Sequence, residues 1–245
     1  MAALGKVYLI GAGPGAADLI TVRGARLLGE AEVVLYDALV TPEMLALCPQ
    51  AELIAVGKRS GQRSTAQTVI NDKLVDCARR YRRVVRLKGG DPMLFGRADE
   101  ELRALEEAGV EVEVVPGITT AVAAAAATLQ PLTKRGVARS VAFFTSSTAP
   151  DEPDHPSLPE TDTLVQYMGG REAAATAERL LAEGRRPDLP VVVVENCSRA
   201  DQRVRRLTLT DLALGLDVAH GPVLVMIGEA MGTRPHQIVN SGSAA

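Results

Sequence analysis

Several residue types are scarce in this sequence of 245 residues. It has three cysteines, Cys48, Cys77 and Cys197, and none of them belongs to a C-x-x-C pair. The sequence therefore indicates neither a disulfide framework nor a zinc site. The three histidines are equally scattered, which argues against a metal site or a triad centred on histidine. Such sparse, unpaired cysteines are typical of the reducing cytosol, so we expect a cytoplasmic protein with no metal.

Charge of one sign and long apolar runs are also missing. The net charge is -3 and no basic stripe is present, which gives no reason to expect a nucleic acid or an anionic membrane as partner. The N-terminus lacks a signal-peptide pattern, and its first apolar run meets glycine too early to span a membrane. Only five of the 27 basic residues are lysine; this bias reflects either genome composition or a need to bind carboxylates bidentately.

What the sequence does contain is an alternation of strand and helix patterns. Apolar runs typical of buried strands lie at 7–10, 32–36, 52–56, 83–87 and 110–115, with helical patterns at 18–30, 66–80 and 98–109. This alternation predicts an α/β fold with mostly parallel sheets flanked by helices. After Gly117 an alanine-rich helix begins and five new strand patterns follow, at 140–145, 163–168, 190–196, 203–209 and 222–228. We therefore expect two α/β domains, 1–116 and 117–245, with a ligand site in the cleft between them.

The proline-rich, acidic segment 147–162 has almost no apolar residues. It is predicted to be a surface loop, either a solvated connection or a lid over a site.

The stretch VYLIGAGPGAADLI carries the first motif with chemical meaning. Gly11, Gly13 and Ala16 fit the pattern G-x-G-x-x-G/A, and Asp37 follows the next strand where a dinucleotide-binding protein places its ribose ligand. Pro14, however, removes a backbone donor where a phosphate loop would use one. The loop thus has three interpretations: a dinucleotide site, a site for a ligand without phosphate, or a tight strand-to-helix turn.

Other polar residues also follow predicted strands. Asp37 and Lys58 each come after a strand, and they form either an acid/base pair or a structural ion pair. In KGGDP, the glycines allow a ligand to approach the backbone closely, although the sequence is also an ordinary turn. Arg97 and Arg135 are candidates for binding an acidic substrate, or are solvated surface residues. Met168 either packs in a core or lines a pocket.

A family resemblance brings these pieces together. GAGPG, LYDALV, VGKR, Gln67 with Asn71, VVRLKGGDPMLFGR, EVVPGIT, PLTKR and YMG occur here in the order found in tetrapyrrole methylases. The sequence resembles this family from Val7 to about Gly228, and LYD, VGKR and LKGGDP-x-x-FGR are similar to the member that methylates uroporphyrinogen III. The resemblance implies a homodimer in which S-adenosylmethionine donates methyl groups to C2 and C7. The product would be precorrin-2, on the way to sirohaem and cobalamin.

The resemblance also implies roles for particular residues. Asp37 would be the proton acceptor and Lys58 the proton donor. Arg97, Glu100 and Arg135 would bind the substrate, which carries eight carboxylates. The residues implied in binding the cofactor are Pro14, Gly89, Gly90, Asp91, Leu94, Thr119, Thr120, Met168 and Cys197.

The sequence departs from the family pattern at a few places. These are Ala98, Asp99, Lys134, Ser146, Ser147 and Cys197. Three other functions remain open: a sibling methylase with a different acceptor, an NAD(P)-binding oxidoreductase, and a binding module without catalysis. Binding of NADH or of S-adenosylhomocysteine would separate the oxidoreductase from the methylases, and loss of turnover on mutating Asp37 and Lys58 would exclude a mere binder.

Overall fold

The computed structural model describes residues 4–57, 67–147, 157–217 and 221–232. The chain divides into two compact units, Met1–Thr120 and Ala121–Ala245. The predicted boundary at 116/117 lies four residues before this division. In the described part of the chain, no helix is long and apolar enough to cross a membrane.

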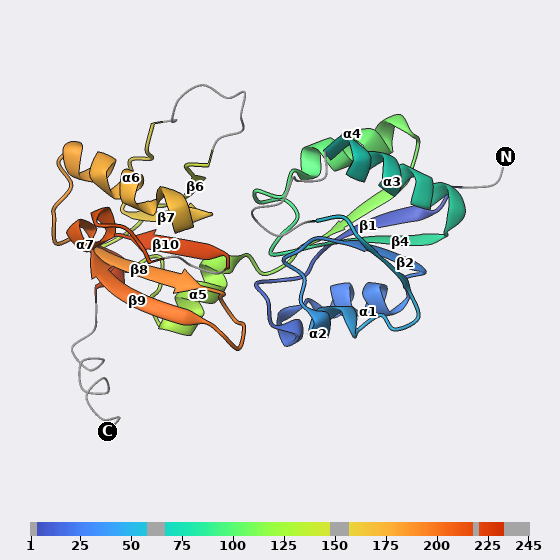
Figure 1. Cartoon of the computed structure of the whole chain (residues 1–245), viewed down its shortest axis with the longest axis horizontal. Helices are drawn as coiled ribbons and strands as arrows, with labels where there is room; N and C mark the ends of the chain where they lie inside the picture. Colours follow the sequence, from blue (N-terminus) through green and yellow to red (C-terminus); the bar gives the residue numbers. More distant parts are fainter. Residues whose placement is uncertain (1–3, 58–66, 148–156, 218–220, 233–245) are drawn as a thin grey trace. The chain divides into compact units, whose positions relative to one another are not determined.

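The first unit is built on one parallel sheet (Figure 1). Its strands are β1 (Lys6–Gly11), β2 (Val33–Tyr36), β3 (Glu52–Ala55), β4 (Arg83–Lys88) and β5 (Val112–Val115). They lie in the order β3-β2-β4-β1-β5, and every neighbouring pair is parallel. All five strands predicted for this half are confirmed, and all five end at the same edge of the sheet. That edge is where open α/β sheets bind ligands.

Helices cover both faces of this sheet, as Figure 1 shows. They are η1 (Ala17–Leu19), α1 (Val22–Gly29), α2 (Pro42–Leu45), α3 (Gln67–Arg80) and α4 (Ala98–Glu107). Helices α1 and α2 lie on one face, and α3 and α4 lie on the other. Thr21 caps α1, because its Oγ1 accepts a 3.1 Å hydrogen bond from the Gly24 amide.

The inner strands of the first sheet, β1, β2 and β4, are largely apolar because both of their faces are buried. In β1, Val7 and Leu9 belong to the core under α3 and α4, whereas Ile10 belongs to the core over α1 and α2. Parallel sheets covered on both sides require such continuous apolar runs. The sequence pattern that predicted the strands is thus the pattern that fixes them between two helical layers.

The second unit contains a mixed sheet, which corrects the prediction of mostly parallel strands for this half. Its strands are β6 (Val141–Thr145), β7 (Thr163–Tyr167), β8 (Pro190–Glu195), β9 (Arg203–Thr208) and β10 (Val223–Ile227), in the order β6-β7-β10-β8-β9. Only β6 and β7 pair in parallel; the other three pairs are antiparallel. The segment between β8 and β9 is too short for a crossover, so β9 must turn back beside β8. Strand β10 enters between β7 and β8 in the reverse direction.

The helices of this unit are α5 (Thr120–Thr128), α6 (Gly169–Ala182), α7 (Leu209–Ala213) and η2 (Glu229–Met231). Helices α6 and α7 pack with apolar side chains of β8 and β10 in one core. The alanine-rich helix predicted after Pro116–Gly117 is confirmed as α5, and Figure 1 draws it on the side of the sheet away from α6.

Candidate functional site

Three loops of the first unit meet backbone to backbone at the carboxyl edge of its sheet. A Cβ atom added to Gly11 would lie 2.5 Å from the Gly117 Cα and 2.7 Å from the Gly90 carbonyl oxygen. A Cβ on Gly117 would lie 2.2 Å from the same oxygen. Gly11 is the last residue of β1, and Gly90 and Gly117 follow β4 and β5, so their lack of a side chain lets the three strand ends close on one another.

The backbone amides of the first glycine loop are already used. The Ala12 amide donates to the Lys88 carbonyl at 2.7 Å, and the Gly13 amide donates to the Gly90 carbonyl at 3.1 Å. The Gly90 amide returns a 2.7 Å bond to Gly13, and Pro14 has no amide hydrogen. A phosphate cradle needs several free amides in succession. Residues 12–14 offer none, which argues against a dinucleotide site at this stretch of the loop.

Asp91 holds two of these loops together. Its Oδ1 accepts a 2.8 Å hydrogen bond from the Met93 amide, and its Oδ2 accepts a 2.8 Å hydrogen bond from the Gly117 amide. Charged acceptors make stronger hydrogen bonds than neutral ones. Asp91 therefore fixes the loop after β4 against the segment after β5.

Asp37 performs the same task one strand further along. It directly follows β2, and its Oδ1 and Oδ2 accept hydrogen bonds from the amides of Leu39 (2.9 Å) and Gly89 (3.2 Å). Gly57, which follows β3, packs so closely that a Cβ there would lie 3.0 Å from the Asp37 Cβ. The ends of β2, β3 and β4 thus converge on this half-buried carboxylate. Lys58, the predicted partner of Asp37, lies outside the described residues.

The loop that leads into α4 carries the candidate substrate ligands. Arg97 pairs with Glu100 through two hydrogen bonds, Nε to Oε1 at 2.7 Å and Nη2 to Oε2 at 2.8 Å. Both side chains are exposed, and the bonds from Arg97 hold the pKa of the Glu100 carboxyl below its usual value. Phe95 and Arg97 have φ angles of 52° and 53°, in the left-handed region that non-glycine residues rarely adopt.

Below this loop lies a charged cluster that the sequence analysis missed. Glu101 is fully buried and bonds Arg86 Nε at 3.0 Å and Lys88 Nζ at 2.9 Å. Burial lowers the pKa of the Lys88 ammonium and the Arg86 charge lowers it further, whereas the charges of Glu101 and Asp37 act in the opposite direction. The sequence did hold a signal, since two basic residues alternate in the otherwise apolar strand VVRLK.

The remaining predicted residues fall in several places. Leu94 lies in the loop before α4, and its amide donates to the Asp91 carbonyl at 3.3 Å. Thr119 and Thr120 are half-buried at the start of α5. Arg135 is exposed in a turn of the second unit closed by a bridge between Lys134 and Ala138.

Met168 and Cys197 follow β7 and β8 in the second unit. Met168 is 52% exposed and has a left-handed φ of 56°, which is at odds with a role in core packing. Cys197 is 3% exposed, and burial raises the pKa of its thiol to about 11. A protonated, buried thiol is a poor nucleophile, so Cys197 is not suited to covalent chemistry.

The departures from the family pattern have ordinary structural partners. Ala98 is buried in the first turn of α4, and Asp99 pairs with Arg103 at 2.5 Å. Ser146 Oγ lies 3.0 Å from Thr176 Oγ1 and accepts a hydrogen bond from Gln166 Nε2 at 3.1 Å. The Ser147 amide bonds the Thr145 hydroxyl. Most of the predicted surface loop at 147–162 lies outside the described residues, so the structure does not test whether it forms a lid.

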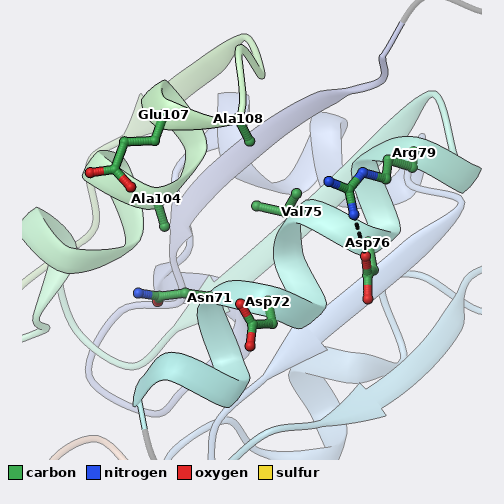
Figure 2. A pocket seen from close by; sticks show the side chains of 8 residues that line it. All are labelled: Asn71, Asp72, Val75, Asp76, Arg79, Ala104, Glu107 and Ala108. Carbon is green, nitrogen blue, oxygen red and sulfur yellow. Dashed lines mark hydrogen bonds and ion pairs between the residues drawn. The ribbon is translucent and has the colours of Figure 1, made fainter.

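A groove on the first unit is lined by none of the predicted site residues, although Asn71 in its lining bonds the Glu100 carbonyl. Figure 2 shows the groove between α3 and α4. Its volume is about 550 Å³. Its lining is Asn71, Asp72, Val75, Asp76, Arg79, Ala104, Glu107 and Ala108. Arg79 pairs with Asp76 within it at 2.8 Å. Among the described residues, no group of His, Cys, Asp and Glu is arranged to hold a metal ion, in this groove or elsewhere.

Comparison with known proteins identifies the family. The model of the Tetrapyrrole (Corrin/Porphyrin) Methylases matches residues 6–213. The chain belongs to the tetrapyrrole methylase family. Among curated relatives, the siroheme synthase of Tolumonas auensis is 48% identical to this chain over 229 residues. The match covers 92% of this chain and 49% of that protein. The chain therefore spans about half the length of the curated relatives it matches.

Solved structures of the family agree with this assignment. The uroporphyrin-III C-methyl transferase of Thermus thermophilus, in complex with S-adenosyl homocysteine, is 41% identical with a TM-score of 0.81 and covers 92% of this chain and 98% of that one. A cobalt precorrin-4 methyltransferase is 30% identical with a TM-score of 0.78, over 93% of this chain and 96% of that one. The fold predicted from the sequence, two α/β units flanked by helices, is the fold of this class of methyltransferases.

Proposed function

We propose that this chain is an S-adenosylmethionine-dependent C-methyltransferase that methylates uroporphyrinogen III at C2 and C7 to give precorrin-2. The observation that carries the proposal is its similarity, over nearly the whole chain, to a uroporphyrin-III C-methyl transferase bound to S-adenosyl homocysteine. The product would supply sirohaem or cobalamin synthesis. The match covers only 49% of the siroheme synthase of Tolumonas auensis, and no activity beyond methylation is proposed for this chain.

The carboxyl edge of the first sheet suits this cofactor better than a dinucleotide. Residues 12–14 present no free amide for a pyrophosphate. A Cβ at Gly90 would meet nothing within 4 Å, so the backbone there faces open space that a ligand can enter. S-adenosylmethionine has no phosphate and needs such backbone edges, one or two carboxylates and apolar side chains. The residues assigned to it are those implied by the family resemblance: Pro14, Gly89, Gly90, Asp91, Leu94, Thr119, Thr120, Met168 and Cys197.

When bound, the cofactor supplies a methyl group already activated on sulfur, and an electron-rich pyrrole carbon takes it as the carbon–sulfur bond breaks. The protein's task is chiefly to hold the two reactants in line. The ring system then loses a proton, and we propose Asp37 as the base that accepts it. Its carboxylate is fixed by two backbone amides and is half-buried at the strand ends. Lys58, the next residue in the sequence after Gly57, is proposed as the proton donor.

Arg97, Glu100 and Arg135 are proposed to bind the substrate. The bidentate Arg97–Glu100 pair is exposed on both sides, so Arg97 keeps N–H donors for a substrate carboxylate and Glu100 can accept from a pyrrole N–H. Arg135 is exposed and contributes charge in the second unit. We also propose a homodimer in the cytoplasm, with no nucleic acid or membrane as partner.

The proposal is tested by anaerobic incubation with S-adenosylmethionine and freshly reduced uroporphyrinogen III, followed by mass spectrometry. Two methyl groups added to the macrocycle would support it. No methylation, with S-adenosylhomocysteine still bound tightly in calorimetry, would keep the cofactor and reject the acceptor. Binding of NADH in place of S-adenosylhomocysteine would revive the oxidoreductase.

A sibling methylase with a later precursor of cobalamin as acceptor is the second candidate. The 30% identity to a cobalt precorrin-4 methyltransferase favours it. Offering both acceptors to the enzyme in one assay separates the two proposals, because only the true acceptor should gain methyl groups at a rate proportional to enzyme.

A further inference from the structure

The buried cluster around Glu101 joins three elements of the first unit. Arg86 and Lys88 alternate with Leu87 on β4, and both reach the same carboxylate on α4. Gln67, the first residue of α3, donates from Nε2 to Glu101 Oε1 at 3.3 Å and to Asn71 Oδ1 at 3.0 Å. The end of β4 and the starts of α3 and α4 are therefore held by one side chain.

The cluster is too deep to be a solvated surface network. The side chains of Arg86 and Lys88 are each 5% exposed and that of Glu101 is 0% exposed. Two cations share one carboxylate, and Arg86 also donates to the Leu87 carbonyl at 3.1 Å. Burying charges costs free energy even when they are paired. Stability alone therefore explains this cluster poorly, which indicates that its charged side chains have a further role.

The loop above the cluster rests directly on Lys88. A Cβ at Gly96 would lie 3.1 Å from the Lys88 Cε and 2.6 Å from the Pro92 carbonyl oxygen. Phe95 and Arg97, on either side of Gly96, both adopt the left-handed conformation. Such residues persist only where the surroundings over-determine them. The lysine stem forms the floor of this strained loop.

Two adjacent glutamates divide their work at the start of α4. Glu100 points outward and pairs with Arg97, while its backbone carbonyl accepts from Asn71 Nδ2 at 3.1 Å. Glu101 points inward and pairs with Lys88 and Arg86. The end of the loop, where Arg97 stands, is thus held from the solvent side by one carboxylate and from the core by the other.

We propose that Lys88 and Glu101 are positioning residues that set the conformation of the 92–97 loop, and thereby the place of Arg97 toward the substrate. Neither residue touches the acceptor; they act through the loop. The inference rests on the proposed function where it names a substrate carboxylate as the ligand of Arg97. The role in holding the loop is independent of that function.

The test compares Lys88→Met with Lys6→Met. Methionine keeps an apolar stem under Gly96 and leaves the neutral Arg86–Glu101 pair, so the variant should fold. Lys6 is the matched control, because it also pairs with two carboxylates, Glu111 and Glu113, but at the opposite end of the sheet. We expect Lys88→Met to raise the KM for uroporphyrinogen III roughly 10-fold to 100-fold, as for loss of a charge-assisted hydrogen bond, with kcat changed far less and Lys6→Met close to wild type.

Two measurements keep the result interpretable. Hydrogen exchange of the loop amides in the whole enzyme should become about tenfold faster in Lys88→Met and stay unchanged in Lys6→Met. Gly96→Ala, whose added methyl would press against the Pro92 carbonyl and the Lys88 stem and would leave the charges in place, should reproduce the rise in KM.

The outcomes separate the two proposals. A wild-type enzyme that methylates normally, with loop exchange and KM unaltered in Lys88→Met, overturns the inference. Parallel losses of acceptor affinity, S-adenosylhomocysteine affinity and thermal stability would reduce Lys88 to a general structural role and also overturn it. Faster loop exchange in a protein whose wild type never methylates uroporphyrinogen III would uphold the positioning role and reject the proposed function.

Discussion

Gly117→Ala should disrupt the meeting point of the three loops. The added methyl would lie 2.2 Å from the Gly90 carbonyl oxygen and 2.7 Å from the Gly11 Cα. Both neighbours are backbone atoms, so no side chain can turn aside and the loops themselves must separate. Overpacking a core costs about 1–3 kcal/mol, and we expect about 3 kcal/mol here. For a unit of this size that corresponds to a fall in Tm of roughly 10 °C.

Thermal unfolding followed by circular dichroism, with calorimetry of S-adenosylhomocysteine, measures this effect. The matched control is Gly29→Ala, at the end of α1, where the nearest atom to an added Cβ is 3.8 Å away. Alanine in a helix gains up to about 1 kcal/mol over glycine, so the control should be neutral or slightly stabilised. A Gly117→Ala protein that melts within about 2 °C of wild type and binds S-adenosylhomocysteine normally would refute the packing argument.

Three further predictions concern single side chains. Arg97→Ala should weaken macrocycle binding and leave S-adenosylhomocysteine binding nearly intact; equal loss of both in calorimetry would contradict its assignment to the substrate. Asp37→Asn should lower kcat about 100-fold or more, as expected for loss of a catalytic base, and single-turnover methyl transfer at the wild-type rate would remove Asp37 from the chemistry. Burial raises the pKa of the Cys197 thiol from 9.0 to about 11. The folded state therefore holds this proton more tightly than the unfolded state does. The resulting contribution to the free energy of unfolding is complete below pH 9 and is lost as the pH rises toward 11. Two pKa units correspond to about 2–3 kcal/mol, and Cys197→Ala should flatten that part of the pH dependence in denaturant titrations; an unchanged slope would show that the thiol is not buried in solution.

The fold was largely predictable where local pattern decides it. The first sheet needs apolar runs buried on both faces, and those runs stand out in the sequence. Thr21 is a cap because a hydroxyl precedes the first helical turn. The single turn α2 is too short to show a helical repeat. The order of strands in the second sheet has no local signature, since the place of β10 between β7 and β8 depends on partners far away in the sequence.

The residues of the candidate site could be predicted from the sequence, but the hydrogen bonds and ion pairs between them could not. Polar residues after strands had to gather at one edge of a parallel sheet, so the neighbourhood of Asp37 and Gly89 follows from topology. The bond between Asp91 and the Gly117 amide joins residues 26 positions apart, and no spacing rule announces it. The buried ion pairs of Glu101 with Arg86 and Lys88 could not be predicted for a related reason. A basic pair on an apolar strand demands a carboxylate, but the sequence offers several candidates and only the packing of α4 selects Glu101.

The glycine motif illustrates how the same letters support different chemistry. G-x-G-x-x-A matches a dinucleotide fingerprint because both kinds of loop need glycine where a strand turns into a helix. What distinguishes them is the direction of the amide bonds. In this chain the Ala12 amide donates to Lys88 at the end of β4 and the Gly13 amide donates to Gly90 in the loop that follows, and Pro14 removes the next donor. The glycines therefore allow close contact between backbones. Whether such a motif can bind a dinucleotide depends on which backbone amides are free to donate hydrogen bonds, and the spacing of the glycines does not show this.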